Sequence, residues 1–120
     1  MKRIAIVTGA SRGIGREIAK MLAKEDIQVI ANYNNSEKKA IELQEELKKE
    51  NINIDIFKAD ISKREDARKL VEYTLEKYKK IDILVNNAGI SEYKMFTEET
   101  DSDWNRVINN NLYSAFVMCQ

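Results

Sequence analysis

The chain contains no histidine and only one cysteine, Cys119, and these shortages exclude several kinds of site. Without histidine there can be no Ser-His nucleophile pair and no histidine-ligated metal, so we expect no metal site. A single cysteine cannot form an internal disulfide, and the fold therefore does not require an oxidising compartment. We expect Cys119 to be a small, unreactive apolar residue of a helix.

No charge of one sign is in excess, and no long apolar segment is present. Lys plus Arg number 20 and Asp plus Glu number 20, which gives no indication of nucleic-acid binding or of a disordered acidic tail. The first apolar run is shorter than that of a signal peptide, and no stretch approaches the length of a membrane span. We therefore expect a cytoplasmic protein that binds neither nucleic acid nor membrane. With 120 residues, the chain can form the core of one domain.

Four short apolar segments fit the strands of a parallel sheet. The first is a continuous apolar run, typical of a strand covered on both faces, and the third alternates as a half-buried strand does. Helical patterns stand between these segments, and strands that alternate with helices form parallel sheets with right-handed crossovers. We predict an α/β fold, a doubly wound parallel sheet that is incomplete, with about four strands and helices on both faces. The strand segments are residues 4–7, 27–31, 52–57 and 81–85.

Three helices are expected between these strands, and a fourth after them. The second begins near Ser36, and the third near Ser62, whose hydroxyl would form a capping box with Glu65. The fourth begins near Asp101 or Ser102, and its apolar face continues to the final residues with no glycine cap and no polar tail. We therefore expect the chain to stop in the middle of an architecture. The buried stripe of the first helix is expected at Ile14, Ile18, Met21 and Leu22, and that of the third, which runs to about Lys80, at Leu70, Val71, Thr74, Leu75 and Tyr78.

Three glycines, Gly9, Gly13 and Gly15, stand between the first strand and the first helix. A diphosphate must approach bare backbone N–H groups and the positive end of a helix, and a side chain would block that approach. The spacing G-x-x-x-G-x-G differs from the G-x-G-x-x-G form of other dinucleotide sites. The pattern favours a dinucleotide site, and a glycine-rich turn that binds nothing is the alternative.

The end of the second strand lacks the carboxylate that an NAD site usually has. Such a site places Asp or Glu roughly 20 residues after the glycine motif, where it bonds the ribose 2′-hydroxyl. Here Asn32 to Asn35 occupy this stretch, and the first carboxylate is Glu37. Arg12, within the glycine loop, could pair with a 2′-phosphate, or it could be a solvated surface residue. The sequence therefore favours NADP(H) as the cofactor.

Two motifs together resemble those of the short-chain dehydrogenase/reductase family. They are TGASRGIG at residues 8–15, after the first strand, and NNAG at residues 86–89, after the fourth. The resemblance covers the whole chain and is closest to the 3-oxoacyl-[acyl-carrier-protein] reductase branch. It implies that the predicted sheet is of the Rossmann type.

The resemblance also implies which residues hold the cofactor. The glycine loop would bind the diphosphate and the adenosine end, Arg12 and Asn34 would face the 2′-phosphate, and Asp60 with Ile61 would flank the adenine. Taken without the resemblance, Asp60 could be a helix-entry residue and residues 86–89 an ordinary turn. The implied cofactor-binding residues are Gly9, Ala10, Ser11, Arg12, Gly13, Ile14, Gly15, Asn34, Asp60, Ile61, Asn87, Ala88 and Gly89.

Asn111 matches one member of the family's catalytic set, which is a Ser, a Tyr-x-x-x-Lys pair and a helix asparagine. By this resemblance, Asn111 would help to hold a water in the proton relay. It is also the polar member of a helical stripe, and a buried polar group needs a partner, so a purely local hydrogen bond is the alternative. We expect Asn109 and Asn110 to face outward. The other members of the stripe are Trp104, Ile108, Ala115 and Met118.

The rest of the catalytic set is expected outside this sequence. Residues 73–77 match Tyr-x-x-x-Lys formally, but they precede the NNAG motif, whereas the family's pair follows it. We reject this match and expect Tyr73 to be a flanking surface residue. Residues 1–120 are therefore expected to be the N-terminal NADP(H)-binding part of a single domain, truncated before the catalytic Ser and Tyr-x-x-x-Lys and inactive alone.

Three functions remain compatible with the sequence. The first is an NADPH-dependent carbonyl reductase, a homo-oligomer at full length, whose substrate is a small molecule or a carrier-bound group such as 3-oxoacyl on acyl-carrier protein. Residues 90–96 depart from the pattern of fatty-acid synthesis reductases, and the chain is also similar to relatives that reduce a 5-aminopentanone group on elongation factor P. The second is a nucleotide-binding module without catalysis. The third is an assembly module, formed by the uncapped apolar helix and a bare sheet edge.

Overall fold

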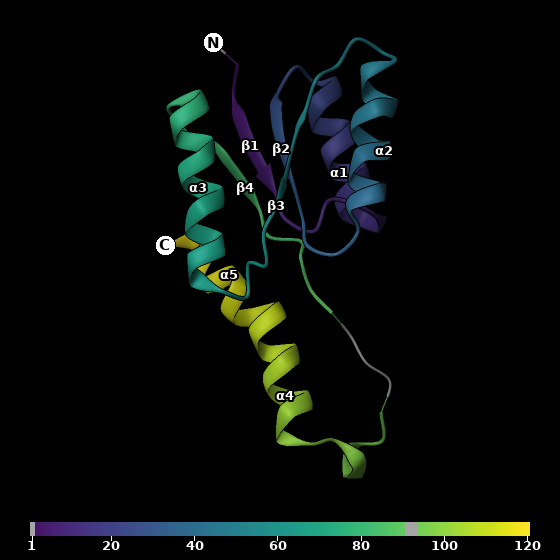
Figure 1. Ribbon diagram of the computed structural model, residues 1–120, viewed down its shortest axis with the longest axis vertical. Helices are drawn as coiled ribbons and strands as arrows, with labels where there is room; N and C mark the ends of the chain where they lie inside the picture. The colour runs from purple at the N-terminus through teal and green to yellow at the C-terminus, as the bar shows by residue number, and fades with distance from the viewer. Residues whose placement is uncertain (1, 91–93) are drawn as a thin grey trace.

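The computed structural model describes residues 2–90 and 94–120. The segment 90–96, which departs from the pattern of fatty-acid synthesis reductases, therefore lies partly outside the described residues. Within these residues, four parallel strands form one sheet in the order β3-β2-β1-β4, with helices on both faces (Figure 1). The predicted α/β, Rossmann-type sheet of about four strands is confirmed. The strands are β1 (Ile4–Val7), β2 (Gln28–Tyr33), β3 (Asp55–Lys58) and β4 (Ile83–Val85). The helices are α1 (Gly13–Lys24), α2 (Glu37–Lys48), α3 (Arg64–Tyr78), η1 (Phe96–Glu98), α4 (Asp101–Ile108), η2 (Asn109–Tyr113) and α5 (Ser114–Cys119).

The sheet separates two apolar cores. Because successive strand side chains point to opposite faces, the neighbours Ile6 and Val7 of β1 belong to different cores. Ile6 packs with Leu70 of α3 and Val117 of α5, whereas Val7 packs with Leu43 of α2. All of β1 is buried, which explains why its sequence is continuously apolar.

β2 continues two residues past the predicted strand. Asn32 and Tyr33, expected in a polar interruption, are only 2% and 6% exposed, and they pair with Phe57 and Lys58 of β3. The expectation was wrong because the Asn32 side chain is satisfied inside the sheet, where its Nδ2 donates to the carbonyl of Ala59 at 3.1 Å. A strand can therefore bury an asparagine when its amide has partners.

The predicted capping box of Ser62 and Glu65 is wrong. α3 begins at Arg64, and the Ser62 hydroxyl donates to Oδ1 of Asp60 at 2.5 Å instead of capping the helix. The residue directly before α3 is Lys63, so Ser62 lies one position too early to cap the helix, and the carboxylate of Asp60 accepts its hydrogen bond. α2 does begin directly after Ser36, although the Ser36 side chain makes no capping bond.

α1 packs against the sheet through small residues and through only two members of the predicted stripe, Ile18 and Leu22. Gly15, Ala19 and Ala23 are buried, while Ile14 and Met21 are 74% and 69% exposed. The expected burial of Ile14 and Met21 was wrong. Small side chains at the contact allow the helix to approach the sheet closely. On α3, Leu75 of the predicted stripe is likewise exposed.

The last helical segment changes its period in the middle. α4 begins at Asp101, as predicted, with a capping box between Thr100 and Asp103. A π-helical turn, η2, follows it and rotates the residues beyond it relative to those before. The predicted stripe is therefore broken, since Trp104 is 62% exposed and Met118 only 6%. Figure 1 shows α4 projecting away from the sheet.

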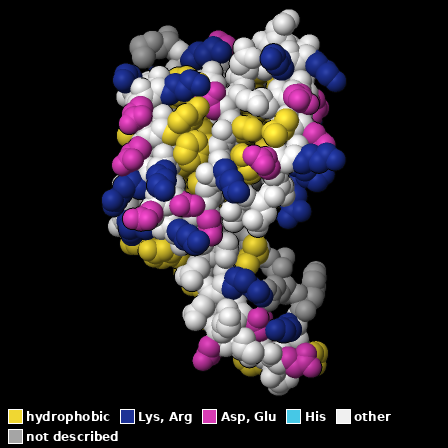
Figure 2. All heavy atoms as spheres, in the orientation of Figure 1, with side chains coloured by type: hydrophobic (Ala, Val, Ile, Leu, Met, Phe, Trp, Pro, Cys, Tyr) yellow, Lys and Arg dark blue, Asp and Glu magenta, His cyan; other side chains and the backbone are white. Residues whose placement is uncertain are grey.

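Charges of both signs are mixed on the face of the molecule seen in Figure 2, where basic and acidic side chains lie next to one another. Arg16 and Lys20 of α1, for example, both pair with Glu46 of α2, each at 2.9 Å. Among the described residues, no helix combines the length and the hydropathy required to cross a membrane.

Candidate functional site

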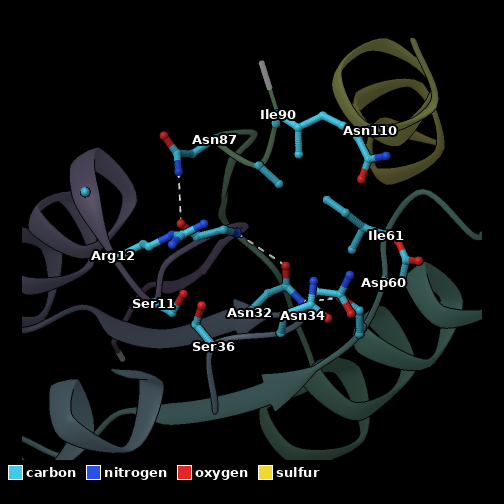
Figure 3. Close-up of a pocket in the computed structure, with 16 residues that line it drawn as sticks. Ser11, Arg12, Asn32, Asn34, Ser36, Asp60, Ile61, Asn87, Ile90 and Asn110 are labelled. Carbon is cyan, nitrogen blue, oxygen red and sulfur yellow. Dashed lines mark hydrogen bonds between the residues drawn. The ribbon is translucent and has the colours of Figure 1, made fainter. Parts of the chain in front are cut away.

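A cavity of about 370 Å³ lies at the carboxyl ends of the four strands (Figure 3). Parallel sheets bind ligands at this edge, and the volume is in the range of small-molecule sites. The lining comes from the segments that follow β1, β2, β3 and β4, together with one residue each of β2, α1 and η2. The lining residues are Gly9, Ser11, Arg12, Gly13, Asn32, Asn34, Asn35, Ser36, Ala59, Asp60, Ile61, Asn87, Ala88, Gly89, Ile90 and Asn110.

Each glycine of the loop after β1 has its own reason to be glycine. Gly9 and Gly13 have φ angles of +60° and +62°, in the left-handed region that other residues rarely adopt. A Cβ on Gly9 would also lie 2.9 Å from the Cα of Ala88. A Cβ on Gly15 would collide with the carbonyl oxygen of Gly9. The loop closes in this shape only because these side chains are missing.

The N-terminus of α1 opens at this loop without a capping side chain. Arg12, the residue before the helix, has extended backbone, and no acidic residue stands in the first turn. Among the described residues, no side chain bonds the first N–H groups of this helix. Free N–H groups and the positive helix end attract an anion, so the loop fits the diphosphate of a dinucleotide.

Thr8 ties the end of β1 to the NNAG segment after β4. Its hydroxyl donates to the carbonyl of Val85 at 3.2 Å and accepts from the N–H groups of Asn87 and Ala88 at 3.0 and 3.1 Å. In return, the Asn87 side chain donates to the carbonyl of Gly9 at 3.0 Å. Residues 86–89 are therefore a segment bound to the glycine loop, not an independent turn. Sequence reasoning gave Thr8 no role, although a hydroxyl directly after a buried strand was the available signal.

Asn32 makes a similar connection on the other side of the loop, and sequence reasoning missed it. Its Oδ1 accepts from the N–H of Gly9 at 3.3 Å, and its carbonyl accepts from the N–H of Ala10 at 2.8 Å. Since its Nδ2 also bonds the carbonyl of Ala59, this one residue of β2 is bonded to the segments after β1 and after β3. Figure 3 shows Asn34 beside it, with Arg12 across from them on the glycine loop.

The lining of the cavity carries one charge of each sign. Within residues 2–90 and 94–120, Arg12 is its only cationic side chain and Asp60 its only carboxylate. Oδ1 of Asp60 already accepts from the N–H and the hydroxyl of Ser62. Glu37 is absent from the lining and accepts from the Tyr33 hydroxyl at 3.3 Å. Burial, and then the charge of Glu37, raises the pKa of Tyr33, so this hydroxyl stays protonated.

Most of the predicted cofactor-binding residues lie together around the cavity, but three of them do not line it. Ala10 is buried beneath the loop, Gly15 lies behind Gly9, and the side chain of Ile14 is 74% exposed. The other ten predicted residues are all part of the lining. The structure also brings Asn35, Ser36 and Ile90 to the cavity, which the sequence reasoning did not select.

Asn111 bonds the backbone of Ile90 instead of lining the cavity. Its Oδ1 accepts from the N–H of Ile90 at 2.6 Å, and its Nδ2 donates to the carbonyl of Ile90 at 2.8 Å. The alternative of a purely local bond is therefore wrong. Asn110, expected to face outward, lines the cavity because the π-helical turn rotates it, and this expectation was also wrong. Holding a water of the proton relay stays a prediction for Asn111.

The formal Tyr-x-x-x-Lys match lies outside the cavity, and its surroundings make its tyrosine a weaker proton donor. The hydroxyls of Tyr73 and Tyr78 donate to Asp55 at 3.0 and 2.8 Å, and Lys77 pairs with the same carboxylate at 3.1 Å. Burial, and then the charge of Asp55, raises the pKa of Tyr73. Burial, and then the hydrogen bond to Asp55, raises the pKa of Tyr78 to about 12. Rejecting the match agrees with this geometry. Tyr73 is half-buried against Phe57, however, rather than a flanking surface residue.

Two further expectations concern cysteine and metals. Cys119 is the last residue of α5, and its Sγ accepts from Nδ2 of Asn86 at 3.3 Å. Among the described residues, no group of three or more acidic or cysteine side chains is arranged to hold a metal ion.

A parallel sheet with an open helix N-terminus and a glycine loop at its carboxyl edge is the arrangement typical of nucleotide-binding α/β proteins. The family model described as short chain dehydrogenase matches residues 3–120. The chain therefore belongs to the short-chain dehydrogenase/reductase family.

Among curated proteins, the chain is 36% identical over 116 residues to the 3-oxoacyl-[acyl-carrier-protein] reductase FabG of Staphylococcus epidermidis. It is 39% identical over 118 residues to the hydroxynaphthalene reductase-like protein Arp2 of Metarhizium guizhouense. These alignments cover 97% and 98% of this chain, but 48% and 44% of the two relatives. The chain thus spans about half the length of the curated relatives that it matches.

Solved structures agree with this assignment. A blue fluorescent protein from a metagenomic library, in complex with NADPH, superposes with a TM-score of 0.90 at 32% identity, covering 98% of this chain and 49% of that one. A mutant short-chain dehydrogenase/reductase of Serratia marcescens superposes with a TM-score of 0.93 at 31% identity, covering 98% and 48%.

Proposed function

We propose that this chain binds NADP(H) and forms the cofactor-binding part of an NADPH-dependent carbonyl reductase. The observation that carries the proposal is the charge of the cavity lining, where the glycine loop meets the end of β2. Arg12 is the cation of the described lining, Asn34 takes the place of an acidic residue, and the carboxylate of Glu37 bonds Tyr33 instead of joining the lining. A 2′-phosphate needs a cation, whereas a ribose 2′-hydroxyl is usually bonded by a carboxylate.

Different residues of the cavity would bind different parts of the cofactor. The N–H groups of the glycine loop and of the first turn of α1 would bind the diphosphate. Arg12 and Asn34 would bind the 2′-phosphate, Asp60 and Ile61 the adenine, and residues 87–89 the remaining length of the cofactor. When bound, NADPH supplies a hydride to the carbonyl carbon of the substrate. The related structure that holds NADPH at 32% identity supports this assignment.

For the substrate, we propose a carrier-bound 3-oxoacyl group or a similar small carbonyl compound. The support is the similarity to the 3-oxoacyl-[acyl-carrier-protein] reductase at 36% identity. Asn111 would contribute to the proton relay through its place beside Ile90, and the 120-residue chain alone would bind the cofactor without turnover. We further propose that the protein acts in the cytoplasm and binds neither nucleic acid nor membrane.

The homo-oligomer that we propose for the full-length protein is supported by exposed apolar side chains of α4, η2 and α5. Trp104, Leu112 and Phe116 are 62%, 64% and 53% exposed, and large apolar groups at a surface favour association. Sedimentation over a range of concentrations should show oligomers that Leu112→Glu dissociates. A chain that stays monomeric at every concentration would contradict this part of the proposal.

The test of cofactor binding is a calorimetric titration of the chain with NADPH and with NADH at one salt concentration. We expect NADPH to bind about tenfold or more tightly than NADH, since charge-assisted bonds to the 2′-phosphate are made only by NADPH. Equal binding, or tighter binding of NADH, would overturn the 2′-phosphate assignment. Absence of binding by both would overturn the proposal that this chain binds the cofactor.

A further inference from the structure

Arg16, on the first turn of α1, connects the glycine loop to α2. One arm of its guanidinium, Nη1, donates to the carbonyl oxygens of Ser11 at 3.2 Å and Lys39 at 3.0 Å. The other arm, Nη2, bonds the carboxylate of Glu46 at 2.9 Å. The side chain is only 20% exposed, so these bonds are made in a partly desolvated position.

The two carbonyl groups belong to two elements that each carry part of the cavity lining. Ser11 precedes Arg12 directly and lines the cavity with it. Lys39 lies in the first turn of α2, three residues after Ser36, which ends the Asn34–Ser36 wall. The Arg16 guanidinium therefore sets the distance between the element that carries Arg12 and the element that carries Asn34. Its planar fork presents donors at fixed angles, which a lysine cannot reproduce.

Glu46 holds the guanidinium in this orientation, and it has a second cation. Lys20, one helical turn after Arg16, pairs with the other oxygen of Glu46 at 2.9 Å and is 19% exposed. Arg16 and Lys20 thus share the helix, the carboxylate partner and the degree of burial. They differ in one respect. Among the described residues, Lys20 pairs with Glu17 and Glu46 and does not bond the carbonyl of Ser11 or that of Lys39.

We propose that Arg16 is a positioning residue that determines the preference for NADP(H), by holding the Arg12 loop against the wall formed by Asn34, Asn35 and Ser36. The inference rests on the proposed cofactor. A 2′-phosphate must touch both walls at once, whereas the diphosphate needs only the glycine loop and the end of α1. Loosening the connection through Arg16 therefore weakens the binding of NADPH more than the binding of NADH.

The test compares Arg16→Met with Lys20→Met in the whole chain. Each variant removes one cation beside Glu46 and keeps an unbranched stem of similar burial. We expect Arg16→Met to weaken NADPH binding by about tenfold and NADH binding by less than about threefold, while Lys20→Met changes both by less than about twofold. Arg16→Lys, which keeps the charge, should fall between Arg16→Met and the wild type in its NADPH-to-NADH ratio.

Amide hydrogen exchange provides a second readout that needs no nucleotide. Arg16→Met should speed exchange in residues 11–13 and at the start of α2, and Lys20→Met should not. Equal weakening of both nucleotides in Arg16→Met, or the same ratio change in Lys20→Met, would overturn the proposal. Unchanged hydrogen exchange in Arg16→Met would overturn the positioning role of Arg16, whether or not the chain binds a nucleotide. Failure of the wild-type chain to bind either nucleotide would contradict only the proposed cofactor.

Discussion

The side-chain amide of Asn111 pairs with both backbone groups of Ile90, a residue 21 positions earlier in the chain, at 2.6 and 2.8 Å. A Cβ on Gly89, the residue before Ile90, would lie 2.8 Å from Oδ1 of Asn111, so the Asn111 side chain would have to move away from this pairing. This pair connects the loop after β4 to the π-helical turn. It places Asn111 where it shapes the end of the cavity without lining it.

Replacing Asn111 by alanine should therefore loosen the segment after β4. The two bonds to Ile90 contribute roughly 1–2 kcal/mol together, because each hydrogen bond has a modest net effect. We expect Asn111→Ala to lower the free energy of unfolding by about this amount in urea denaturation. Asn109→Ala, an exposed asparagine of the same turn, serves as the control and should change stability little. Equal effects of the two substitutions would contradict the assigned role.

Two glycine substitutions should differ in severity although their backbone angles are alike. Gly9 and Gly13 both have φ near +60°, which alone costs roughly 1 kcal/mol or more for alanine. A Cβ on Gly9 also lies 2.9 Å from the Cα of Ala88, whereas one on Gly13 meets nothing within 4 Å. We expect Gly9→Ala to destabilise the chain clearly more than Gly13→Ala in thermal denaturation. A reversed order would show that the loop can move away from residue 88.

Arg12 should influence the choice of nucleotide rather than the fold. Its side chain is exposed at the cavity and carries the charge proposed to bind the 2′-phosphate. Arg12→Gln should weaken NADPH binding by about tenfold, leave NADH nearly unchanged, and reduce the salt dependence of NADPH binding. Arg68→Gln, an exposed arginine of α3, is the matched control for lost charge. If both variants weaken NADPH equally, the effect belongs to net charge and not to a contact.

The start of α4 should loosen in acid through Asp103. The hydrogen bond from Lys94, and then those from the backbone and the hydroxyl of Thr100, lower the pKa of Asp103 to about 2, from an ordinary value of 3.8. Because the folded pKa lies below the ordinary one, Asp103 stabilises this segment above about pH 4, and the contribution is lost as the pH falls toward 2.

Hydrogen exchange of α4 between pH 5 and pH 2.5 measures this change. The wild type should lose protection there over that range, whereas Asp103→Asn should show less protection already at pH 5 and little further loss. Asp101→Asn, exposed in the same turn, is the control and should keep the wild-type profile. Protection in the wild type that does not depend on pH would contradict the prediction.

The sequence alone was sufficient for the parallel sheet and for most residues of the cavity. The sheet and the glycine loop follow from local patterns: apolar runs followed by helical stripes, and glycines at places where a chain reverses between a strand and a helix. Asn34, Asp60, Ile61 and residues 87–89 were predicted from the family resemblance. Once strands lie parallel, their carboxyl ends meet at one edge. Residues such as Arg12, Asp60 and Asn87, which follow three different strands, are then brought together by connectivity.

The tertiary structure decided the contacts between segments that are distant in sequence. The burial of Asn32, the bonds of Thr8 to residues 87 and 88, and the two-armed contact of Arg16 each need an acceptor or donor from another loop, and no periodicity reveals such partners. The local pattern was also insufficient at Ser62, which lies one residue outside the cap position of α3 and donates its hydroxyl to Asp60. A polar side chain takes the nearest partner with good geometry in three dimensions, and that partner exists only after the chain has folded.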